Sequence, residues 1–311
     1  MESICFIVNS QKRKLGPFQN RVAKCFSDSY KVKFLLTHGY RSAEHLANTA
    51  VEQGFRYIIA VGGDGTVNEV INGVMLHPEN VRKNVVVGVL PKGTGNDFAR
   101  NIGATTSVSN LRKVIESGQH KTIDLINITY TDNHGHTTSH YCNNIADVGV
   151  GPSTILSADK LSGWLGSNLA FSFSALKGLF QKPHLIEITA DTFNFKGEIK
   201  CVCLANGRYF GSGIGIAPLA DLTNGTMEVV VIEDVSPLLF VKLMTALRAA
   251  KPIIHRKVHY HTAKQVTITA ERDTLPLDLD GEVLGHAPIY AEALPACINV
   301  LGENFTQGQK N

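Results

Sequence analysis

Residues Val61–Val70 read VGGDGTVNEV, a stretch in which a strand signal, a glycine turn and a helix signal meet around one carboxylate. The apolar run Tyr57–Val61 leads into it, and such runs are typical of strands that are covered on both faces. Beyond the glycines, apolar residues recur at helical spacing as far as Met75. The stretch therefore predicts a turn between the carboxyl end of a strand and the amino end of a helix.

A glycine turn in this position is suited to binding phosphate. Backbone N–H groups and the positive end of the helix dipole face the turn, and glycines let an anion approach the backbone without a Cβ in the way. Asp64 alone would repel a phosphate, so we expect a divalent cation or an acceptor hydroxyl between its carboxylate and the phosphates. An ordinary Asp-Gly turn is the alternative interpretation.

A second strand–turn–helix unit follows along the chain. Val85–Leu90 is another buried-strand run, and Pro91–Arg100 reads PKGTGNDFAR, again a glycine turn that leads into a helix. Two such units joined by a right-handed crossover place both glycine loops at the carboxyl edge of one parallel sheet. We therefore expect the two loops to face one cleft.

These two stretches resemble the motifs of a known family. Gly62–Thr66, with Asn68 and Glu69, is similar to the nucleotide-binding signature of the diacylglycerol kinase catalytic-domain family, which includes sphingosine and ceramide kinases. Pro91–Arg100 resembles the second motif of that family's bacterial soluble lipid-kinase branch. The GGDGT core also occurs in the more distant NAD kinases, but the two motifs together, about thirty residues apart, are a strong signal for the lipid kinases.

The resemblance implies that ATP is the phosphoryl donor and that Mg²⁺ is required. The first turn, Asn9–Arg13, departs from the family's usual Asn-Pro followed by glycine, although Lys12 and Arg13 could supply charge there. The residues that the resemblance assigns to nucleotide binding are Asn9, Thr37, Gly62, Gly63, Asp64, Gly65, Thr66, Val67, Asn68, Glu69, Thr94, Asn96 and Asp97.

The order of the expected elements divides the chain in two. Residues 1–120 alternate strand runs with helical stretches, which predicts an α/β domain with a doubly wound, mostly parallel sheet. Strands then follow one another over 121–295 with only two expected helices, Ser162–Leu179 and Pro237–Ala250, which predicts a mainly antiparallel β-sandwich. We expect nucleotide binding in the first domain and lipid binding in the second. The resemblance implies that the terminal segment 296–311 returns to the first.

Composition excludes several classes of protein. With 311 residues, 43% of them hydrophobic, the chain can build sizeable cores, which rules out a disordered or fibrous protein. The net charge of +3 is too small for a nucleic-acid-binding signature, though a basic patch could favour an anionic membrane surface. The six cysteines lack metal-ligand spacing and are expected to be reduced.

The same sequence predicts where the protein resides. The amino terminus has no basic region typical of a signal peptide, and no apolar run approaches the ~18 residues of a membrane span. We expect a cytoplasmic protein whose membrane contact is peripheral, at the inner face. The sequence is compatible with a homodimer.

A third informative stretch is Leu275–Glu282, LPLDLDGE. In an extended chain its leucines point one way and Asp278 and Asp280 the other, while Gly281 allows a turn that presents Glu282. Acids this close are costly to bury together, so we expect them to face solvent or to bind metal or substrate. From spacing alone, an ordinary Asp-Gly hairpin is the better interpretation.

The resemblance changes that interpretation, because the DGE sequence at 280–282 matches the family's third signature, whose acids serve as general base and magnesium partner. It implies catalytic roles for Glu282, Asp280 and Asp64, and it leaves open whether Glu282 or Asp280 is the base. This hypothesis requires that the three acids meet across one cleft.

Three further segments allow a functional and a structural interpretation. Ile216–Thr226 resembles a family segment that binds a structural magnesium through Asp221, Asn224 and Thr226, but a metal-free Asn-Gly hairpin is nearly as well supported. The histidines His134, His136 and His140 are expected in a solvated hairpin loop rather than at a metal. The apolar stretch Leu161–Phe180 is expected to be a core helix rather than a lipid groove.

The sequence thus predicts an ATP- and magnesium-dependent kinase that phosphorylates a lipid hydroxyl, with diacylglycerol as the leading acceptor and phosphatidic acid as its product. An NAD kinase is one alternative, and the motif Gly93–Asp97 argues against it. A nucleotide- or lipid-binding regulator without turnover is another, and the intact acids of all three motifs disfavour it.

Overall fold

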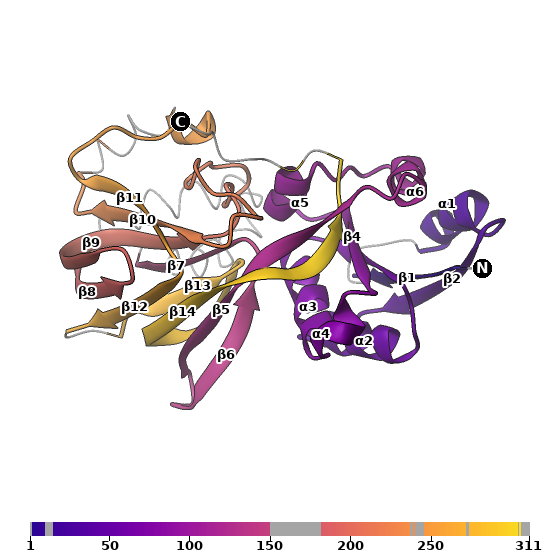
Figure 1. The fold of residues 1–311 in the computed structure, drawn as a ribbon, viewed down its shortest axis with the longest axis horizontal. Coiled ribbons are helices and arrows are strands. Elements are labelled where there is room, and N and C mark those ends of the chain that lie inside the picture. Colours follow the sequence, from indigo (N-terminus) through magenta and orange to yellow (C-terminus); the bar gives the residue numbers. More distant parts are fainter. Residues whose placement is uncertain are drawn as a thin grey trace, which may run out of the picture. The chain divides into compact units, whose positions relative to one another are not determined.

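The structure is a computed structural model that describes residues 2–9, 15–149, 182–236, 239, 246–271, 274–303 and 305 (Figure 1). The described residues form two compact units, one within Met1–Ile123 and Ala296–Thr306 and the other within Asp124–Pro295. Four sequence predictions fall outside the described residues wholly or in large part: Lys12 and Arg13, Leu161–Phe180, Ser162–Leu179, and most of Pro237–Ala250.

A parallel sheet forms the centre of the first unit. Its strands β1 (Glu2–Val8), β2 (Tyr30–Leu36), β3 (Tyr57–Gly62) and β4 (Val86–Pro91) lie in the order β4-β3-β1-β2, and each neighbouring pair is parallel. The carboxyl end of β14 (Glu282–Leu301) pairs with β4, also in parallel. Every residue of β3 and β4 is buried, as their continuous apolar sequence predicts.

Helices connect these strands and cover them. Phe6 of β1 packs edge-to-face on Phe18 and Phe26, and the same apolar cluster includes Leu111. In Figure 1, α1 and α6 lie on one side of the sheet of this unit and α2, α3 and α4 on the other. The bounds are α1 (Leu15–Phe26), α2 (Ser42–Glu52), α3 (Asp64–Met75), α4 (Glu79–Arg82), α5 (Asp97–Ile102) and α6 (Val108–Glu116).

The second unit is rich in strands, and the expectation of a mainly antiparallel second half is confirmed. It contains most of β14 and the following strands: β5 (His120–Asp132), β6 (Thr137–Cys142), β7 (Ile145–Gly149), β8 (His184–Ala190), β9 (Asn194–Ala205), β10 (Met227–Glu233), β11 (Val258–Ala263), β12 (Gln265–Ala270) and β13 (Pro276–Leu279). β5 begins within the first unit, and β14 ends there.

The strand pairings of the second unit close into a ring. β9 pairs with β7, β7 with β13, β13 with β14, β14 with β12, β12 with β8, and β8 again with β9. The long strands β9 and β14 close it because each pairs with its two neighbours in the ring through different parts of its length. The ring encloses one apolar core, to which Ile188, Val202, Leu277 and Ile289 belong.

None of the helices in the described ranges is both long enough and apolar enough to cross a membrane. The histidine hairpin was predicted correctly: β5 and β6 pair in antiparallel fashion, and the backbone of Asp132 bonds to that of His136 across the turn. All six cysteines are free thiols, and the Sγ atoms of Cys201 and Cys203 lie 3.6 Å apart on one face of β9.

Candidate functional site

The two glycine loops of the first unit touch each other. β3 and β4 are adjacent and parallel, with Gly62 opposite Pro91, so the loops that follow them leave from one edge of the sheet. A Cβ on Gly93 would lie 2.4 Å from the Cα of Gly63, which means that the two loops pack backbone against backbone. The N–H of Lys92 also donates to the carbonyl of Gly62 at 2.7 Å. The prediction that both loops lie at one sheet edge is confirmed.

The first loop leads directly into helix α3, whose amino end has no side-chain cap. Gly63 is the N-cap of α3 and Asp64 is its first residue, and no side chain caps the helix from the N-cap position. The first N–H groups of an α-helix have no carbonyl partner within the helix. At the amino end of α3 they combine with the helix dipole, which is the arrangement that binds phosphate in other proteins.

Asp64 links the two loops. Its Oδ1 accepts the backbone N–H of Phe98, in the first turn of α5, at 3.0 Å. Burial raises the pKa of Asp64, while hydrogen bonds from the backbone of Phe98, Asn96 and Asp97 oppose that rise. The carboxylate of the first loop is therefore part of the structure of the second.

Gly95 leaves a space between two carboxylates. A Cβ at this position would lie 3.0 Å from the Oδ2 of Asp64 and 3.1 Å from the Oδ2 of Asp97. Carboxylate oxygens are the ligands that Mg²⁺ prefers, so the residues present fit a magnesium ion. No three acidic, histidine or cysteine side chains gather as metal ligands in the part of the chain that the structure describes. A magnesium ion here would therefore complete its shell with phosphate oxygens and water.

Asn96 fixes the shape of the second loop. Its backbone is left-handed, with φ 52°, and its side chain bonds twice to Gly93. Its Oδ1 accepts the N–H of Gly93 and its Nδ2 donates to the carbonyl of Gly93, both at 2.8 Å. Thr94, at the tip of this loop, is exposed. Asn96 thus shapes the loop, while Thr94 is the side chain that faces solvent.

Two other predicted contacts reach the same sheet edge. Asn9 follows β1, and its Nδ2 donates to the Oγ1 of Thr66 at 3.3 Å. Thr37 follows β2, is buried, and donates its N–H to the carbonyl of Val8 at 3.0 Å. The parallel strand order therefore brings Asn9, Thr37 and Thr66 to the edge that carries the glycine loops.

Val67, Asn68 and Glu69 are engaged inside the first unit instead. Val67 and Asn68 are buried, and the side chain of Asn72 donates to the Oδ1 of Asn68 at 3.1 Å. The Oε2 of Glu69 accepts the N–H of Ala43 in the first turn of α2 at 2.8 Å. Burial raises the pKa of Glu69. In this structure these side chains hold α3 in place.

In the second unit, the acidic turn between β13 and β14 is buried more deeply than the sequence predicts. Asp278 is 4% exposed and Asp280 8%. The Oδ2 of Asp280 accepts the N–H of Asn143 at 2.9 Å, and its Oδ1 accepts those of Asn144 and Ile145 at 3.1 and 3.0 Å. Asp280 is therefore buried rather than solvent-facing, and hydrogen bonds from three backbone N–H groups stabilise its charged form.

Asp278 has a different partner. It lies opposite Asp147 of β7 in the antiparallel pairing of β13 with β7. Burial raises the pKa of Asp147 to about 7 and that of Asp278 well above its usual range. Two neighbouring buried carboxylates cannot both ionise cheaply, so the pair retains a proton. The sequence analysis missed Asp147, whose signal is an acid inside the apolar run Ile145–Val150.

Glu282 completes this turn. It is the first residue of β14 and is half-buried, and it follows Gly281, whose φ of 94° is the left-handed conformation that the turn needs. The N–H of Gly281 donates to the Oδ1 of Asp278 at 3.0 Å. The buried acids on the preceding strand therefore fix the backbone from which Glu282 projects.

The predicted structural magnesium loop is a hydrogen-bonded turn. The Oδ1 of Asp221 accepts the N–H and hydroxyl of Thr223, and that of Asn224 accepts those of Thr226, at 2.8 to 2.9 Å. Asp124, which the sequence analysis did not single out, accepts the N–H of Gly225 at 2.6 Å. These hydrogen bonds give the loop its turn.

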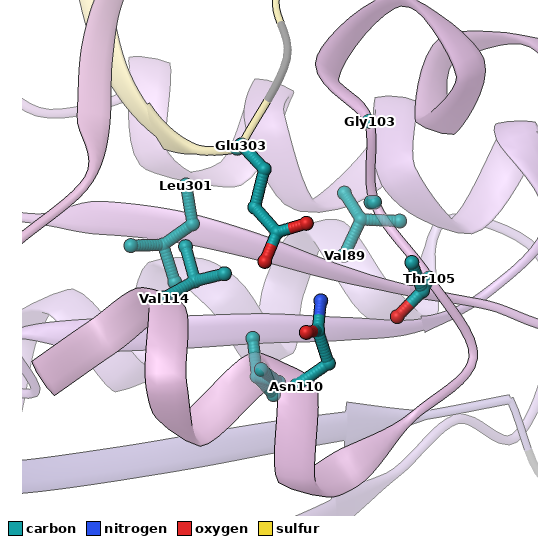
Figure 2. Close-up of a pocket in the computed structure, with 10 residues that line it drawn as sticks. Val89, Gly103, Thr105, Asn110, Val114, Leu301 and Glu303 are labelled. Atoms are coloured by element: carbon teal, nitrogen blue, oxygen red, sulfur yellow. The ribbon is translucent and has the colours of Figure 1, made fainter. Parts of the chain in front are cut away.

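Figure 2 shows a small pocket of the first unit, lined by α6, β4 and the end of β14. The carboxylate of Glu303 and the amide of Asn110 point into it between Val89, Val114 and Leu301. Its volume is about 20 Å³. Ligand sites typically measure ~300 Å³ or more, so this pocket holds neither a nucleotide nor a lipid.

Comparisons with known proteins assign the chain to a family. The diacylglycerol kinase catalytic domain matches residues 3–128, and the YegS C-terminal NAD kinase beta sandwich-like domain matches residues 147–302. The diacylglycerol kinase of Bacillus subtilis (strain 168) is 32% identical over 254 residues, which are 79% of this chain and 77% of that protein. A probable lipid kinase YegS-like of Yersinia pestis (strain Pestoides F) is 30% identical over 299 residues, 96% of each chain.

Solved structures show the same fold. The crystal structure of a diacylglycerol kinase from Bacillus anthracis str. Sterne matches with a TM-score of 0.77 at 21% sequence identity, covering 97% of both chains. Sequence and fold therefore agree: residues 147–302 match the YegS C-terminal domain, and the chain belongs to the diacylglycerol kinase family.

Proposed function

We propose that this lipid kinase transfers the terminal phosphoryl group of ATP to a lipid hydroxyl, with diacylglycerol as acceptor and phosphatidic acid as product. One observation carries the proposal: the two glycine loops pack on each other at the amino end of α3, beside the oxygens of Asp64 and Asp97. The acceptor class is supported by the names of the relatives, a diacylglycerol kinase and a probable lipid kinase.

The phosphates would bind at the glycine loops of the first unit. The N–H groups at the start of α3 offer hydrogen bonds, and the exposed Thr94 offers a hydroxyl. Asp64 and Asp97, with Gly95 leaving room between them, would hold a magnesium ion. When bound, magnesium neutralises negative charge on the phosphates. A doubly wound sheet in this unit would keep both loops at its carboxyl edge.

We assign the general base to Glu282 and a positioning role to Asp280. A base must accept a proton from the acceptor hydroxyl, and the oxygens of Asp280 already accept three backbone N–H groups. Protonating Asp280 would weaken those bonds. Glu282 is half-buried and stands on the turn that Asp278 and Asp280 fix, so it has the better access to a substrate.

The remaining roles follow from this assignment. The first unit would bind the nucleotide and the second the lipid. A structural magnesium at Asp221, Asn224 and Thr226 stays a prediction, because local hydrogen bonds already satisfy that turn. We place the enzyme in the cytoplasm, acting on lipids of the inner membrane face.

The experiment that tests the assignment compares two acids of one strand, β14. Glu282→Gln should lower kcat for diacylglycerol phosphorylation about 10²- to 10⁴-fold, because the base is lost while the fold is kept. Glu292→Gln, on the same strand β14, is the matched control and should retain full activity. The labelled product is chloroform-soluble phosphatidic acid. Full activity of Glu282→Gln would contradict the assignment.

A further inference from the structure

We propose that residues 248–257 of the second unit form a bilayer-docking segment that inserts Ile254 into the surface of an anionic membrane. This proposal rests on the proposed function, because a kinase that acts on a membrane lipid must meet the bilayer. The evidence for it comes from one exposed apolar side chain and from the cations of the same segment. None of these residues belongs to the proposed kinase site.

Ile254 is the apolar part of the segment. It is 100% exposed, whereas Leu76, another exposed aliphatic residue among those described, is 63% exposed. A fully exposed isoleucine buries no apolar surface, so its side chain contributes no hydrophobic free energy to folding. An apolar side chain presented in this way is typical of a surface that binds a membrane or another partner.

The backbone beside Ile254 is anchored, so this exposure is set by the fold. Ile253 is buried in an apolar cluster with Val235, Leu247 and Val258. The N–H of Ile253 donates to the hydroxyl of Tyr260 at 3.1 Å, and that of Val258 donates to the carbonyl of His255 at 3.0 Å. The side chain of Ile253 is therefore buried in the unit, while that of the next residue, Ile254, is held in solvent.

The same segment carries three exposed cations. Arg248, Lys251 and Arg256 are exposed, and none of them forms an ion pair or side-chain hydrogen bond within the described ranges. Residues 248–257 contain no acid. The carboxylates of the preceding strand end are already occupied, because Glu233 contacts His259 at 2.6 Å and Asp234 contacts Lys200 at 3.2 Å.

An anionic bilayer matches both features at once. Headgroup phosphates attract the three cations, whose aliphatic stems can lie along the interface, and the acyl region accepts the isoleucine. A nucleic acid would satisfy the cations but leave Ile254 in water. The segment also leads into β11, a strand of the same sheet as β13, which precedes the acidic turn. Docking would thus serve the unit that carries Glu282.

The expected affinity is modest and sensitive to salt. One isoleucine and three cations fall short of a stable anchor, so binding should be reversible and should weaken as ionic strength rises. Each surface cation contributes about fivefold in partitioning onto an anionic bilayer. Burial of the isoleucine contributes about tenfold or more.

The test is co-sedimentation of the full chain with vesicles of phosphatidylcholine, alone or mixed with phosphatidylglycerol. Wild type should bind the mixed vesicles and not the neutral ones. Ile254→Ser should weaken binding about tenfold, and the Lys251→Gln/Arg256→Gln double variant about 25-fold, at five per cation. Leu76→Ser and Lys24→Gln/Lys31→Gln, which change exposed residues of the first unit, are matched controls and should bind like wild type.

Kinase activity on short-chain diacylglycerol in detergent micelles separates this proposal from the proposed function. Ile254→Ser should keep wild-type activity there, because no bilayer is needed. Vesicle binding by a chain that is inactive in micelles would support the docking segment and overturn the proposed function. Ile254→Ser that binds vesicles like wild type, or controls that lose binding equally, would overturn the docking segment. So would RNA binding lost in the charge variant while vesicle binding is kept.

Discussion

Asp64 combines a structural and a chemical role in one carboxylate. Its Oδ1 caps the N–H of Phe98, and its Oδ2 faces the space left by Gly95. Replacing it with alanine confounds the two roles, because a buried N–H left without an acceptor costs about 1–3 kcal/mol. Asparagine keeps an acceptor and removes only the charge.

Asp64→Asn should therefore leave the free energy of unfolding within about 1 kcal/mol of wild type while kinase activity falls at least about 100-fold. Thermal unfolding and initial rates measure the two effects separately. Glu79→Gln, in α4 of the same unit, is the control that should change neither. Wild-type activity in Asp64→Asn would show that its charge plays no part in phosphoryl transfer.

The buried pair Asp147–Asp278 makes the free energy of unfolding depend on pH. Both pKa values are raised in the folded state above the ~3.9 of an unfolded aspartate, so the folded state binds more protons between those values. The stabilising contribution is full below pH ~4 and is lost as pH rises through the folded pKa of Asp147, about 7.

Urea unfolding of wild type should therefore give a free energy that falls between pH 5 and pH 8, by on the order of 1 kcal/mol per pH unit. Asp147→Asn should flatten this slope, since a neutral amide has no proton to lose. Glu198→Gln, an exposed acid of the same unit, should keep the wild-type slope. Identical slopes for Asp147→Asn and wild type would refute the shared proton.

Among the elements, those with local signals could be predicted from sequence and those without could not. β3, α3 and β4 follow from their apolar runs and from the glycines between them. β11 has little local signal, because histidines interrupt its apolar alternation. β7 is only five residues long and exists as a strand because β9 and β13 flank it.

The close packing of the two glycine loops makes a prediction at the level of elements. Gly93→Ala would place a methyl group 2.4 Å from the Cα of Gly63 and push the loops apart. ATP affinity, measured by calorimetry, should fall at least about tenfold, because the phosphate contacts depend on loop position. Gly16→Ala in α1, where no atom lies within 4 Å of the added Cβ, should leave it unchanged. Equal affinities for Gly93→Ala and wild type would remove the loops from the nucleotide site.

For the whole molecule, sequence motifs could predict the family but not which role each of its acids has. The GGDGT and DGE motifs identify Asp64, Asp280 and Glu282 as a set. Only the fold separates Asp280 from Glu282, because the N–H groups that bind Asp280 belong to Asn143–Ile145, far away in the chain. The partner of Asp278 is equally remote in sequence, so no local pattern could reveal their shared proton.

The measurement that tests the account most directly is phosphoryl transfer by the purified chain from γ-labelled ATP, with magnesium, to diacylglycerol or NAD offered in parallel. The account predicts label in chloroform-soluble phosphatidic acid, with none in NAD, and loss of that label in Glu282→Gln. Label in NAD, or none in either acceptor with correctly folded protein, would contradict it.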